Sequence, residues 1–228
     1  MNAKFKELLK TLEIDINDKQ LNQFDNYYTL LVEWNKKINL TAITEKDEVY
    51  LKHFYDSLCL IKAHKLSTET ILDVGSGAGF PSIPLKIIFP NIKITIIDSL
   101  NKRIIFLKEL IKVLNIDVEL IHGRAEELNR HNQYDIVTAR AVAPLNILTE
   151  LCLPFVTVNG YFLPLKSQNF SEEVKTIINT LHTLGGKIEK IIDYSYADNT
   201  RIIPKIIKTR KTSKKYPRAF SKIKKTPL

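Results

Sequence analysis

The residues best suited to chemistry surround a glycine-rich turn, ILDVGSGAGFP, at positions 71–81. The apolar residues at its start predict a buried strand that the chain leaves near Asp73. Gly75, Gly77 and the glycine that follows them allow positive φ angles, and they let a ligand approach the backbone more closely than a Cβ atom would permit. Asp98 ends the next apolar run, where a carboxylate can accept hydrogen bonds from ribose hydroxyls. This pattern predicts a binding site for a cofactor that contains a ribose.

The spacing of the glycines distinguishes between two classes of cofactor. A dinucleotide fingerprint is G-x-G-x-x-G, whereas Phe80 occupies the place of its third glycine here. S-adenosylmethionine has no phosphate that needs a helix N-terminus, and its sulfonium is a cation that Asp73 beside the turn would suit. We therefore expect S-adenosylmethionine rather than a dinucleotide, held by Asp73, Gly75, Gly77 and Asp98. The alternative is a tight turn that binds no ligand.

The loops after the third and fourth predicted strands supply further candidates. Ligands of open α/β sheets bind at the carboxyl ends of the strands, so Ala125 and Glu126 can meet an adenine and Arg140 can face the methyl acceptor. The fourth-strand loop, ARAVAP, contains neither the Asn/Asp-Pro-Pro-aromatic motif of amine methylation nor the cysteine of pyrimidine-carbon methylation. It suits a ring nitrogen with a free lone pair, such as guanine N7, whose methylation needs no general base and depends on positioning.

Arg140 is the residue to which we assign the catalytic role, as a positioning group. Its guanidinium can recognise guanine O6 or a phosphate, or it can help to hold the cofactor. The alternative is a structural salt bridge to Asp135 or Glu126. Lys166, after the fifth predicted strand, can contact a phosphate or simply be a solvated strand end.

From Thr70 onward strands and helices alternate, which is typical of a doubly wound parallel sheet. Two β-rich runs near the end predict an antiparallel hairpin. We expect the α/β fold class, with the Rossmann-like sheet of a class I S-adenosylmethionine-dependent methyltransferase and an N-terminal helical extension. The predicted strands lie near 70–74, 92–98, 117–122, 134–139 and 159–166, the helices near 81–89, after Asp98, and at 145–155 and 171–183, and the hairpin at 187–196 and 200–209.

The N-terminal part of the chain has helical periodicity. Leu21, Phe24 and Tyr28 recur at intervals of three or four, and Asp18 is available as a helix cap. A second helical stretch, at 45–63, carries His53, which we expect to pack or cap rather than act as a base. We predict three parts: a helical extension at 1–66, a methyltransferase domain at 67–209 and a basic tail at 210–228.

The formal net charge of +9 is concentrated at the C-terminal end. Positions 201–228 hold 11 Lys or Arg and no acidic residue, whereas 1–200 hold 23 basic and 25 acidic residues. Such asymmetry suggests a polyanionic partner, and nucleic acid is the usual one, although a solubilising tail would have the same composition. The residues that we expect to bind RNA are Lys166, Arg210, Lys211, Lys214, Lys215 and Arg218.

Composition narrows the remaining choices. Cys59 and Cys152 are far apart and lack metal-ligand spacing, so we expect buried thiols in a reducing compartment and no metal. No stretch reaches the length of a membrane span, and the first residues lack the apolar core of a signal peptide. We expect a cytoplasmic monomer with no membrane partner.

Five segments together resemble the bacterial small-subunit ribosomal RNA methyltransferase G family, also called the glucose-inhibited division protein B family. The glycine motif alone is shared by many methyltransferases, but its conjunction with NLTAI and TARAVAPL is highly specific. The resemblance covers nearly the whole chain. The segments are NLTAITEKDEVYLKHFYDSL, ILDVGSGAGFPSIPLKIIFP, IDSLNKRIIFLKEL, GRAEEL and DIVTARAVAPL.

The resemblance implies transfer of a methyl group from S-adenosylmethionine to N7 of one guanine in 16S ribosomal RNA, in the loop near the decoding centre, on free RNA or the 30S subunit. Its cofactor contacts fall on Gly75, Phe80, Asp98, Ala125, Glu126 and Arg140. One departure concerns the tail, because Ser221 stands where the family usually has a glycine after Tyr-Pro-Arg.

Three other functions compete with this one. A nucleotide-dependent oxidoreductase is disfavoured by Phe80 at the third fingerprint position. A ribose-directed RNA methyltransferase would use the same cofactor site with another acceptor. An RNA-binding assembly factor could retain the methyltransferase fold without catalysis.

Overall fold

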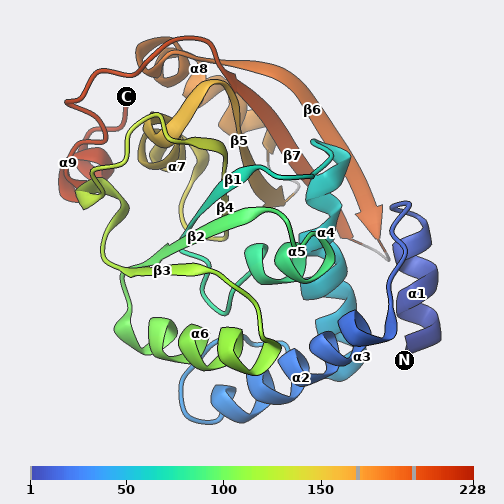
Figure 1. The fold of residues 1–228 in the computed structure, drawn as a ribbon. Coiled ribbons are helices and arrows are strands. Elements are labelled where there is room, and N and C mark those ends of the chain that lie inside the picture. Colours follow the sequence, from blue (N-terminus) through green and yellow to red (C-terminus); the bar gives the residue numbers. More distant parts are fainter. Residues whose placement is uncertain (1, 168–169, 197–198) are drawn as a thin grey trace.

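The computed structural model describes residues 2–167, 170–196 and 199–228. Its centre is a seven-stranded sheet in the order β3-β2-β1-β4-β5-β7-β6, with the first five strands parallel and β7 antiparallel to both neighbours. Helices cover both faces (Figure 1). The predicted parallel sheet and its closing hairpin are therefore confirmed. The strands are β1 (Thr70–Val74), β2 (Lys93–Asp98), β3 (Glu119–His122), β4 (Tyr134–Arg140), β5 (Val156–Ser167), β6 (Gly186–Tyr196) and β7 (Asn199–Lys208).

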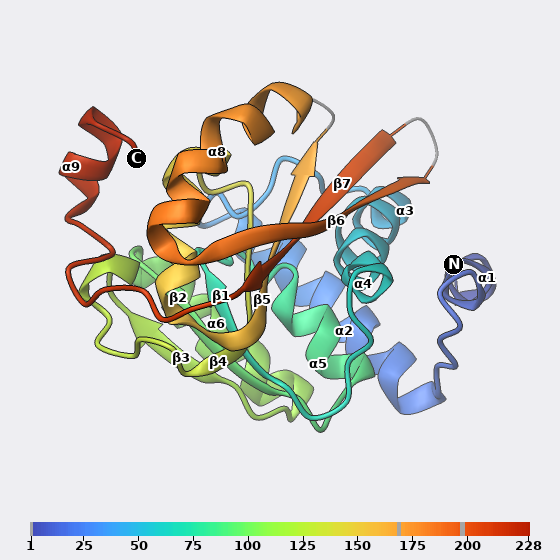
Figure 2. The same ribbon diagram turned by 90° about the horizontal axis from the view of Figure 1, so that it is seen from above.

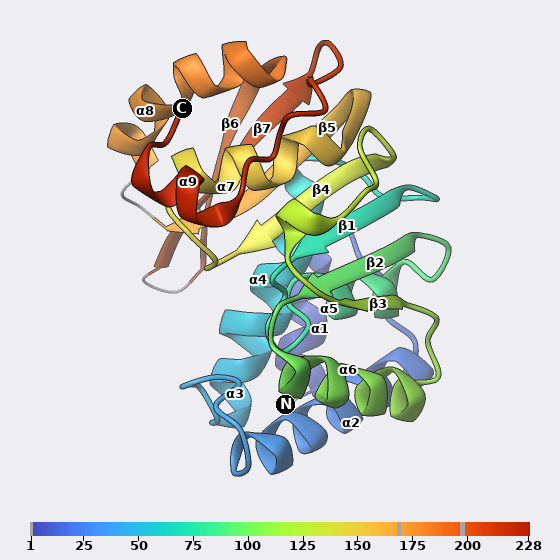
Figure 3. The same ribbon diagram turned by 90° about the vertical axis from the view of Figure 1, so that its left-hand side faces the viewer.

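The helices divide between the two faces of the sheet (Figure 3). The helices α7, α8 and α9 lie on one face, and α2, α5 and α6 lie on the other. The N-terminal helical segments are α1 (Asn2–Lys10), α2 (Asp18–Asn35), α3 (Lys46–Val49), a π-helical stretch (Tyr50–Tyr55), α4 (Asp56–Leu58) and a 3-10 turn (Cys59–Lys62). The others are α5 (Ser82–Ile88), α6 (Asn101–Leu114), a 3-10 turn (Ala125–Glu127), α7 (Leu145–Cys152), a 3-10 turn (Leu153–Phe155), α8 (Phe170–Leu184) and α9 (Phe220–Lys225).

Two hydrophobic cores form because side chains alternate between the faces of each strand. On β1, Ile71 belongs to the core beneath α5 and α6, whereas Leu72 and Val74 belong to the core beneath α7 and α8. The first core also contains the N-terminal helices, including Phe24 and Phe54. The predicted extension at 1–66 therefore shares its hydrophobic core with the sheet.

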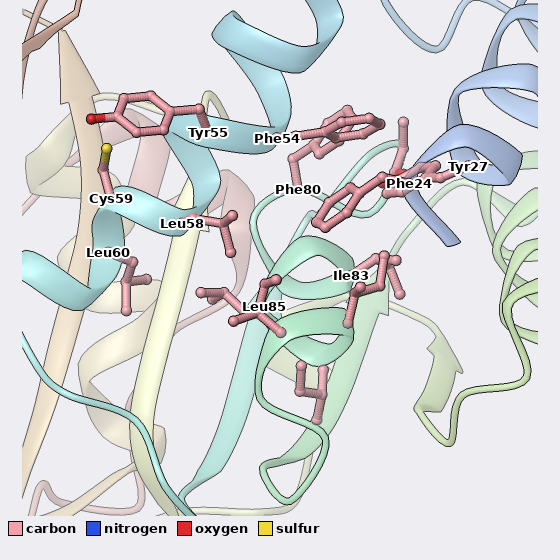
Figure 4. Close-up of a cluster of buried hydrophobic side chains, with 14 of the residues drawn as sticks. Phe24, Tyr27, Phe54, Tyr55, Leu58, Cys59, Leu60, Phe80, Ile83 and Leu85 are labelled. Atoms are coloured by element: carbon pink, nitrogen blue, oxygen red, sulfur yellow. The ribbon is translucent and has the colours of Figure 1, made fainter. Parts of the chain in front are cut away.

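The junction between the N-terminal helices and the glycine turn is a cluster of aromatic rings (Figure 4). Phe80 is stacked on Tyr27, with ring centroids 5.5 Å apart, and Phe54 packs against Tyr27 at 5.0 Å. The Tyr27 hydroxyl donates a 2.5 Å hydrogen bond to the Ala78 carbonyl of the turn. The N-terminal helices thus hold the conformation of the glycine turn.

The helix predicted from the periodicity is present as α2, but the predicted cap was wrong. The helix is capped by Asn17, whose side chain accepts a hydrogen bond from the Gln20 amide while the Gln20 side chain accepts one from the Asn17 amide. Asp18 is the first helical residue instead. Leu21 and Phe24 lie on the buried face of the helix, which also includes the completely buried Tyr27, whereas Tyr28 is half-buried at its margin.

The C-terminal segment packs on the domain and does not project from it. Tyr216 and Ile223 are buried in the core beneath α7 and α8, and α9 lies beside α7. Seen from above, α9 and α1 lie on opposite sides of the molecule (Figure 2). Ser221, which replaces the family's usual glycine, lies within α9 and requires no special backbone angle.

Candidate functional site

Three adjoining cavities lie at the carboxyl ends of β1, β2 and β4. We call them cavities A, B and C, with volumes of about 330, 230 and 250 Å³. Gly75, Arg103 and Ala141 line both A and B, whereas His53, Arg140 and Ala141 line both B and C. The three cavities therefore adjoin one another along this edge of the sheet.

Cavity A collects the residues expected to contact an adenosine. Asp98 is almost completely buried, yet it lines this cavity together with Ala125 and Glu126. The Asp98 carboxylate accepts hydrogen bonds from the amides of Gly77 (3.2 Å) and Leu100 (2.9 Å). The full lining is Val74, Gly75, Ile97, Asp98, Ser99, Arg103, Gly123, Arg124, Ala125, Glu126, Ala141, Val142, Leu151 and Phe220.

Cavity B lies over the glycine turn. The turn has positive φ at Gly75 (+73°) and Gly77 (+63°), as its sequence predicts, and a Cβ atom at Gly77 would meet no atom within 4 Å. Gly79 has positive φ as well (+100°), and a Cβ there would in addition lie 2.6 Å from the Ile83 side chain. The lining of cavity B is Leu40, Thr41, His53, Gly75, Ser76, Gly77, Ala78, Phe80, Arg103, Arg140 and Ala141.

Cavity C is lined by four basic side chains. Arg140 and Lys166 were expected there, and Lys52 and Arg201 come from parts of the chain that the sequence analysis did not connect with the site. The complete lining is Ile43, Lys52, His53, Asp56, Arg140, Ala141, Leu165, Lys166 and Arg201. Its charge suits a nucleotide, because guanidinium and ammonium groups can contact phosphate and base oxygens.

Arg140 is held at the junction of cavities B and C by a partner that we did not predict. Its Nη1 lies 2.9 Å from Oδ2 of Asp56, and its guanidinium lies over the Phe80 ring at 5.1 Å. The predicted alternative partners were wrong: Asp135 accepts hydrogen bonds from Thr70, and Glu126 lies 3.8 Å from Arg124. The sequence separation of 84 residues between Arg140 and Asp56 explains why no local pattern indicated the pair.

Asp56 also gathers the end of the hairpin into the site. Its Oδ1 accepts a 2.9 Å hydrogen bond from the Tyr194 hydroxyl and lies 3.6 Å from Nε of Arg201. Burial and the neighbouring Asp56 carboxylate raise the pKa of Tyr194 far above its usual range, so its hydroxyl remains a donor. The β6–β7 hairpin thus contributes to cavity C as well as completing the sheet.

His53 is buried and its ring is fully engaged, in agreement with the expected packing role. It stacks on Phe80 at 4.6 Å, and its Nδ1 lies 2.7 Å from Nη2 of Arg140. Burial, followed by the charge of Arg140, lowers its pKa to about 3. The ring is therefore neutral at physiological pH and a weak base.

Asp73 lies beneath the glycine turn and lines none of the three cavities. Its side chain is completely buried, and neither carboxylate oxygen has a hydrogen-bond partner among the described residues. Burial raises its pKa to about 7, and nearby Ser82 moderates that rise. Alternation along β1 turns Asp73 toward the core beneath α5, away from the cavities. A direct contact between Asp73 and a cofactor stays a prediction.

The residues expected to bind RNA fall into two groups. Lys211, Lys214 and Lys215 are exposed, and the ion pairs of the described residues include none of the three. Arg210 is exposed but donates a hydrogen bond to the His182 carbonyl. These residues remain available to a polyanion.

Lys166 and Arg218 are held by acidic residues. Lys166 lies 2.8 Å from Glu173 and is not a solvated strand end. Arg218 donates to the completely buried Glu150 from Nε (2.7 Å) and Nη2 (2.6 Å), and its amide also reaches Glu150 (3.1 Å). Binding of RNA by Arg218 stays a prediction, but the geometry gives this residue a structural role.

The described part of the chain holds no group of three or more side chains arranged to bind a metal ion. Cys59 and Cys152 are both buried, and burial raises the pKa of each thiol. No helix within the described ranges combines the length and apolar character needed to cross a membrane.

The likeness to solved structures supports the fold. A putative methyltransferase from Bacillus halodurans matches with a TM-score of 0.56 at 15% identity, over 68% of this chain and 99% of that one. The M. jannaschii TYW2 structure in complex with AdoMet matches with a TM-score of 0.54 at 16% identity, over 64% of this chain and 72% of the other. The fold is that of the class I S-adenosylmethionine-dependent methyltransferases.

The sequence comparisons identify the family. A family model described as rRNA small subunit methyltransferase G matches residues 20–216. A protein named ribosomal RNA small subunit methyltransferase G from Lactococcus lactis subsp. lactis is 50% identical, over 98% of both chains. One of the same name from Staphylococcus saprophyticus is 52% identical, over 96% of this chain and 95% of that one. The chain belongs to the rRNA small subunit methyltransferase G family.

Proposed function

We propose that this protein transfers a methyl group from S-adenosylmethionine to N7 of a specific guanine in 16S ribosomal RNA. The observation that carries the proposal is that the three cavities adjoin one another, with Arg140 lining both B and C. Cavity A suits the adenosine of the cofactor, cavity B its methionine part and cavity C the acceptor nucleotide. A ribosomal RNA substrate makes the cytoplasm the expected location, and we propose that the protein acts as a monomer.

The residues present fit this cofactor. Cavity A offers Asp98 and Glu126, whose carboxylates can accept hydrogen bonds from ribose hydroxyls and an adenine amino group. Cavity B offers open space at Gly77, because a Cβ built there would meet no protein atom within 4 Å. A side chain at this position would take up space that a ligand could use. Phe80, which stands in place of the third fingerprint glycine, does not obstruct either cavity. Its ring is buried among Tyr27, Phe54 and His53.

The chain's own residues position the reactants and need not remove a proton. S-adenosylmethionine supplies an electrophilic methyl group, and guanine N7 has a lone pair in its neutral state. Arg140 is fixed by Asp56 and His53, so its guanidinium is pre-organised where the acceptor enters. Aligning the two reactants and excluding water account for the acceleration in this proposal.

Basic groups at two places support an RNA substrate. Cavity C carries Lys52, Arg140, Lys166 and Arg201, and the C-terminal segment carries exposed lysines. The first group suits the target nucleotide and the second suits the phosphates of the surrounding RNA. The arrangement favours recognition of a nucleotide drawn out of a structured RNA.

The test is to incubate the protein with S-adenosylmethionine and 16S RNA, free or in 30S particles taken from cells that lack it. Nuclease digestion and mass spectrometry should then show 7-methylguanosine at one position. A product methylated on ribose would contradict the N7 assignment. Salt-sensitive RNA binding without methyl transfer by the cofactor-loaded protein would favour an assembly factor that retains the fold.

A further inference from the structure

Thr41 lies at the end of a chain of hydrogen bonds that begins at Asp56. Arg140 donates to Asp56 Oδ2 at 2.9 Å and, through Nη2, approaches Nδ1 of His53 at 2.7 Å. Nε2 of the same imidazole lies 2.7 Å from Oγ1 of Thr41. The path connects the carboxylate beneath cavity C with a hydroxyl that lines cavity B.

The direction of each hydrogen bond is set by Arg140. A guanidinium has only donors, so Nδ1 of His53 must accept and carries no proton. The nearby Lys52 carbonyl, 3.0 Å from Nδ1, therefore receives no hydrogen bond from the ring. Because burial and Arg140 also keep the imidazole neutral, its one proton lies on Nε2 and is donated to Thr41.

The Thr41 hydroxyl is left with a proton to donate. Its oxygen accepts from His53 Nε2 and from the Ile43 amide at 3.0 Å, which occupies both lone pairs. None of the hydrogen bonds among the described residues gives the hydroxyl proton an acceptor. Thr41, which lines cavity B, thus has a hydroxyl donor left and no free acceptor.

Cavity B is suited to a negatively charged group. Arg103 and Arg140 both line it, and its lining contains no Asp or Glu. Each arginine also pairs with a carboxylate that lines an adjoining cavity, Arg103 with Asp98 at 3.3 Å and Arg140 with Asp56 at 2.9 Å, and keeps further N–H donors. We propose that the Thr41 hydroxyl donates a hydrogen bond to the carboxylate of the methionine part of the cofactor. The inference rests on the proposed function in that it takes S-adenosylmethionine as the ligand of cavities A and B.

The test compares two ligands that differ only in this carboxylate. S-adenosylhomocysteine has it, and decarboxylated S-adenosylhomocysteine keeps the amine and lacks it. Calorimetric titration of Thr41→Val should show a dissociation constant for S-adenosylhomocysteine that is raised roughly tenfold or more. The reason is that loss of a hydrogen bond to a charged group weakens binding by about this factor. For the decarboxylated ligand, Thr41→Val and wild type should agree within about twofold. Thr41→Ser should bind both ligands as the wild type does.

Controls separate this contact from a general effect on the fold. Thr44→Val changes an exposed threonine that lines none of the three cavities, and it should change neither dissociation constant. Thr41→Ala offers a second removal of the hydroxyl should valine prevent folding. Equal losses for both ligands, or no loss for either, would overturn the proposal. Failure of the wild type to bind S-adenosylhomocysteine would instead contradict the proposed function.

Discussion

Asp56 and Arg140 form a nearly buried ion pair, with Oδ2 and Nη1 2.9 Å apart, that joins the N-terminal helices to the carboxyl end of β4. Arg140 occupies the edge at which open α/β sheets bind ligands, whereas Asp56 lies in a helix that is not part of the sheet. The N-terminal region therefore contributes directly to the site. It sets the position of the guanidinium that lines both the cofactor cavity B and the acceptor cavity C in our proposal.

Replacing Asp56 should reduce both stability and activity. Asp56→Ala leaves the Arg140 guanidinium without its carboxylate in a nearly buried place, and the loss of one partner of such a pair costs about 3–5 kcal/mol in the free energy of unfolding. The freed guanidinium should also lower kcat for methyl transfer more than it changes the affinity for S-adenosylhomocysteine. Urea denaturation and steady-state kinetics measure the two effects.

Tyr194→Phe is the matched control for that variant. It removes one hydrogen bond to the Asp56 carboxylate but keeps the ion pair, so the free energy of unfolding should fall by about 1.5–3 kcal/mol, less than for Asp56→Ala. If Asp56→Ala were no less stable than Tyr194→Phe, the ion pair would have no structural importance. Unchanged kcat in Asp56→Ala would show that Arg140 needs no support from this carboxylate.

The Arg218–Glu150 pair should support cofactor binding through the C-terminal segment. Phe220 follows this pair closely and lines cavity A, and Glu150 is completely buried. Arg218→Met should lower the free energy of unfolding by about 3–5 kcal/mol, because it leaves the Glu150 charge buried and unpaired. It should also weaken S-adenosylhomocysteine binding.

Phe220→Ala separates the two effects of that change. It keeps the ion pair and should weaken S-adenosylhomocysteine binding with a smaller loss of stability, as calorimetric titration and urea denaturation would show. Lys222→Ala, an exposed position in the same helix α9, serves as the control. Binding by Phe220→Ala equal to that of Lys222→Ala would exclude α9 from the cofactor site.

Sequence reasoning recovered the sheet well, because its signals are local. A buried strand followed by the glycine turn fixes the first β–α unit, and Asp98 falls where the next strand must end. The five parallel strands and the hairpin all lie within a few residues of their predicted positions. The α2 cap was displaced by one residue because Asn17 and Asp18 both have suitable side chains.

The polar network of the site could not be predicted in the same way. Asp56 meets Arg140 and Arg201 only through packing of segments that are far apart in the chain. The contact between Thr41 and His53 spans twelve residues and depends on the loop between them. The charge of the tail was evident from composition. The composition did not indicate that Arg218 forms an ion pair with Glu150 or that Glu150 is buried. The resemblance to a family indicated that NLTAI matters and did not say which atom Thr41 presents.

The exposed lysines of the C-terminal segment should govern the salt dependence of RNA binding. Each phosphate contact contributes about 0.7 to the slope of log affinity against log salt for single strands, so the triple change Lys211→Gln, Lys214→Gln and Lys215→Gln should reduce that slope by about 2. The free energy of unfolding should stay within about 0.5 kcal/mol, because all three are exposed. Filter binding at several salt concentrations measures the slope, and an unchanged slope would remove these lysines from the RNA surface.

Asp73 should make the stability of the cofactor-free protein fall as pH rises. Burial raises its pKa from 3.8 to about 7, so between these values the folded protein keeps a proton that the unfolded chain has released. The free energy of unfolding then decreases through that window by about 1.4 kcal/mol per pH unit from this group, and the loss is complete above pH 7.

Asp73→Asn, which cannot ionise, should escape this decrease. Its stability relative to the wild type, measured by urea denaturation at pH 5, 6 and 8, should therefore rise with pH, whereas Asp15→Asn, at an exposed site, should show no such trend. A constant difference between Asp73→Asn and the wild type would mean that the carboxyl is ionised throughout, with a partner or solvent access in the folded state.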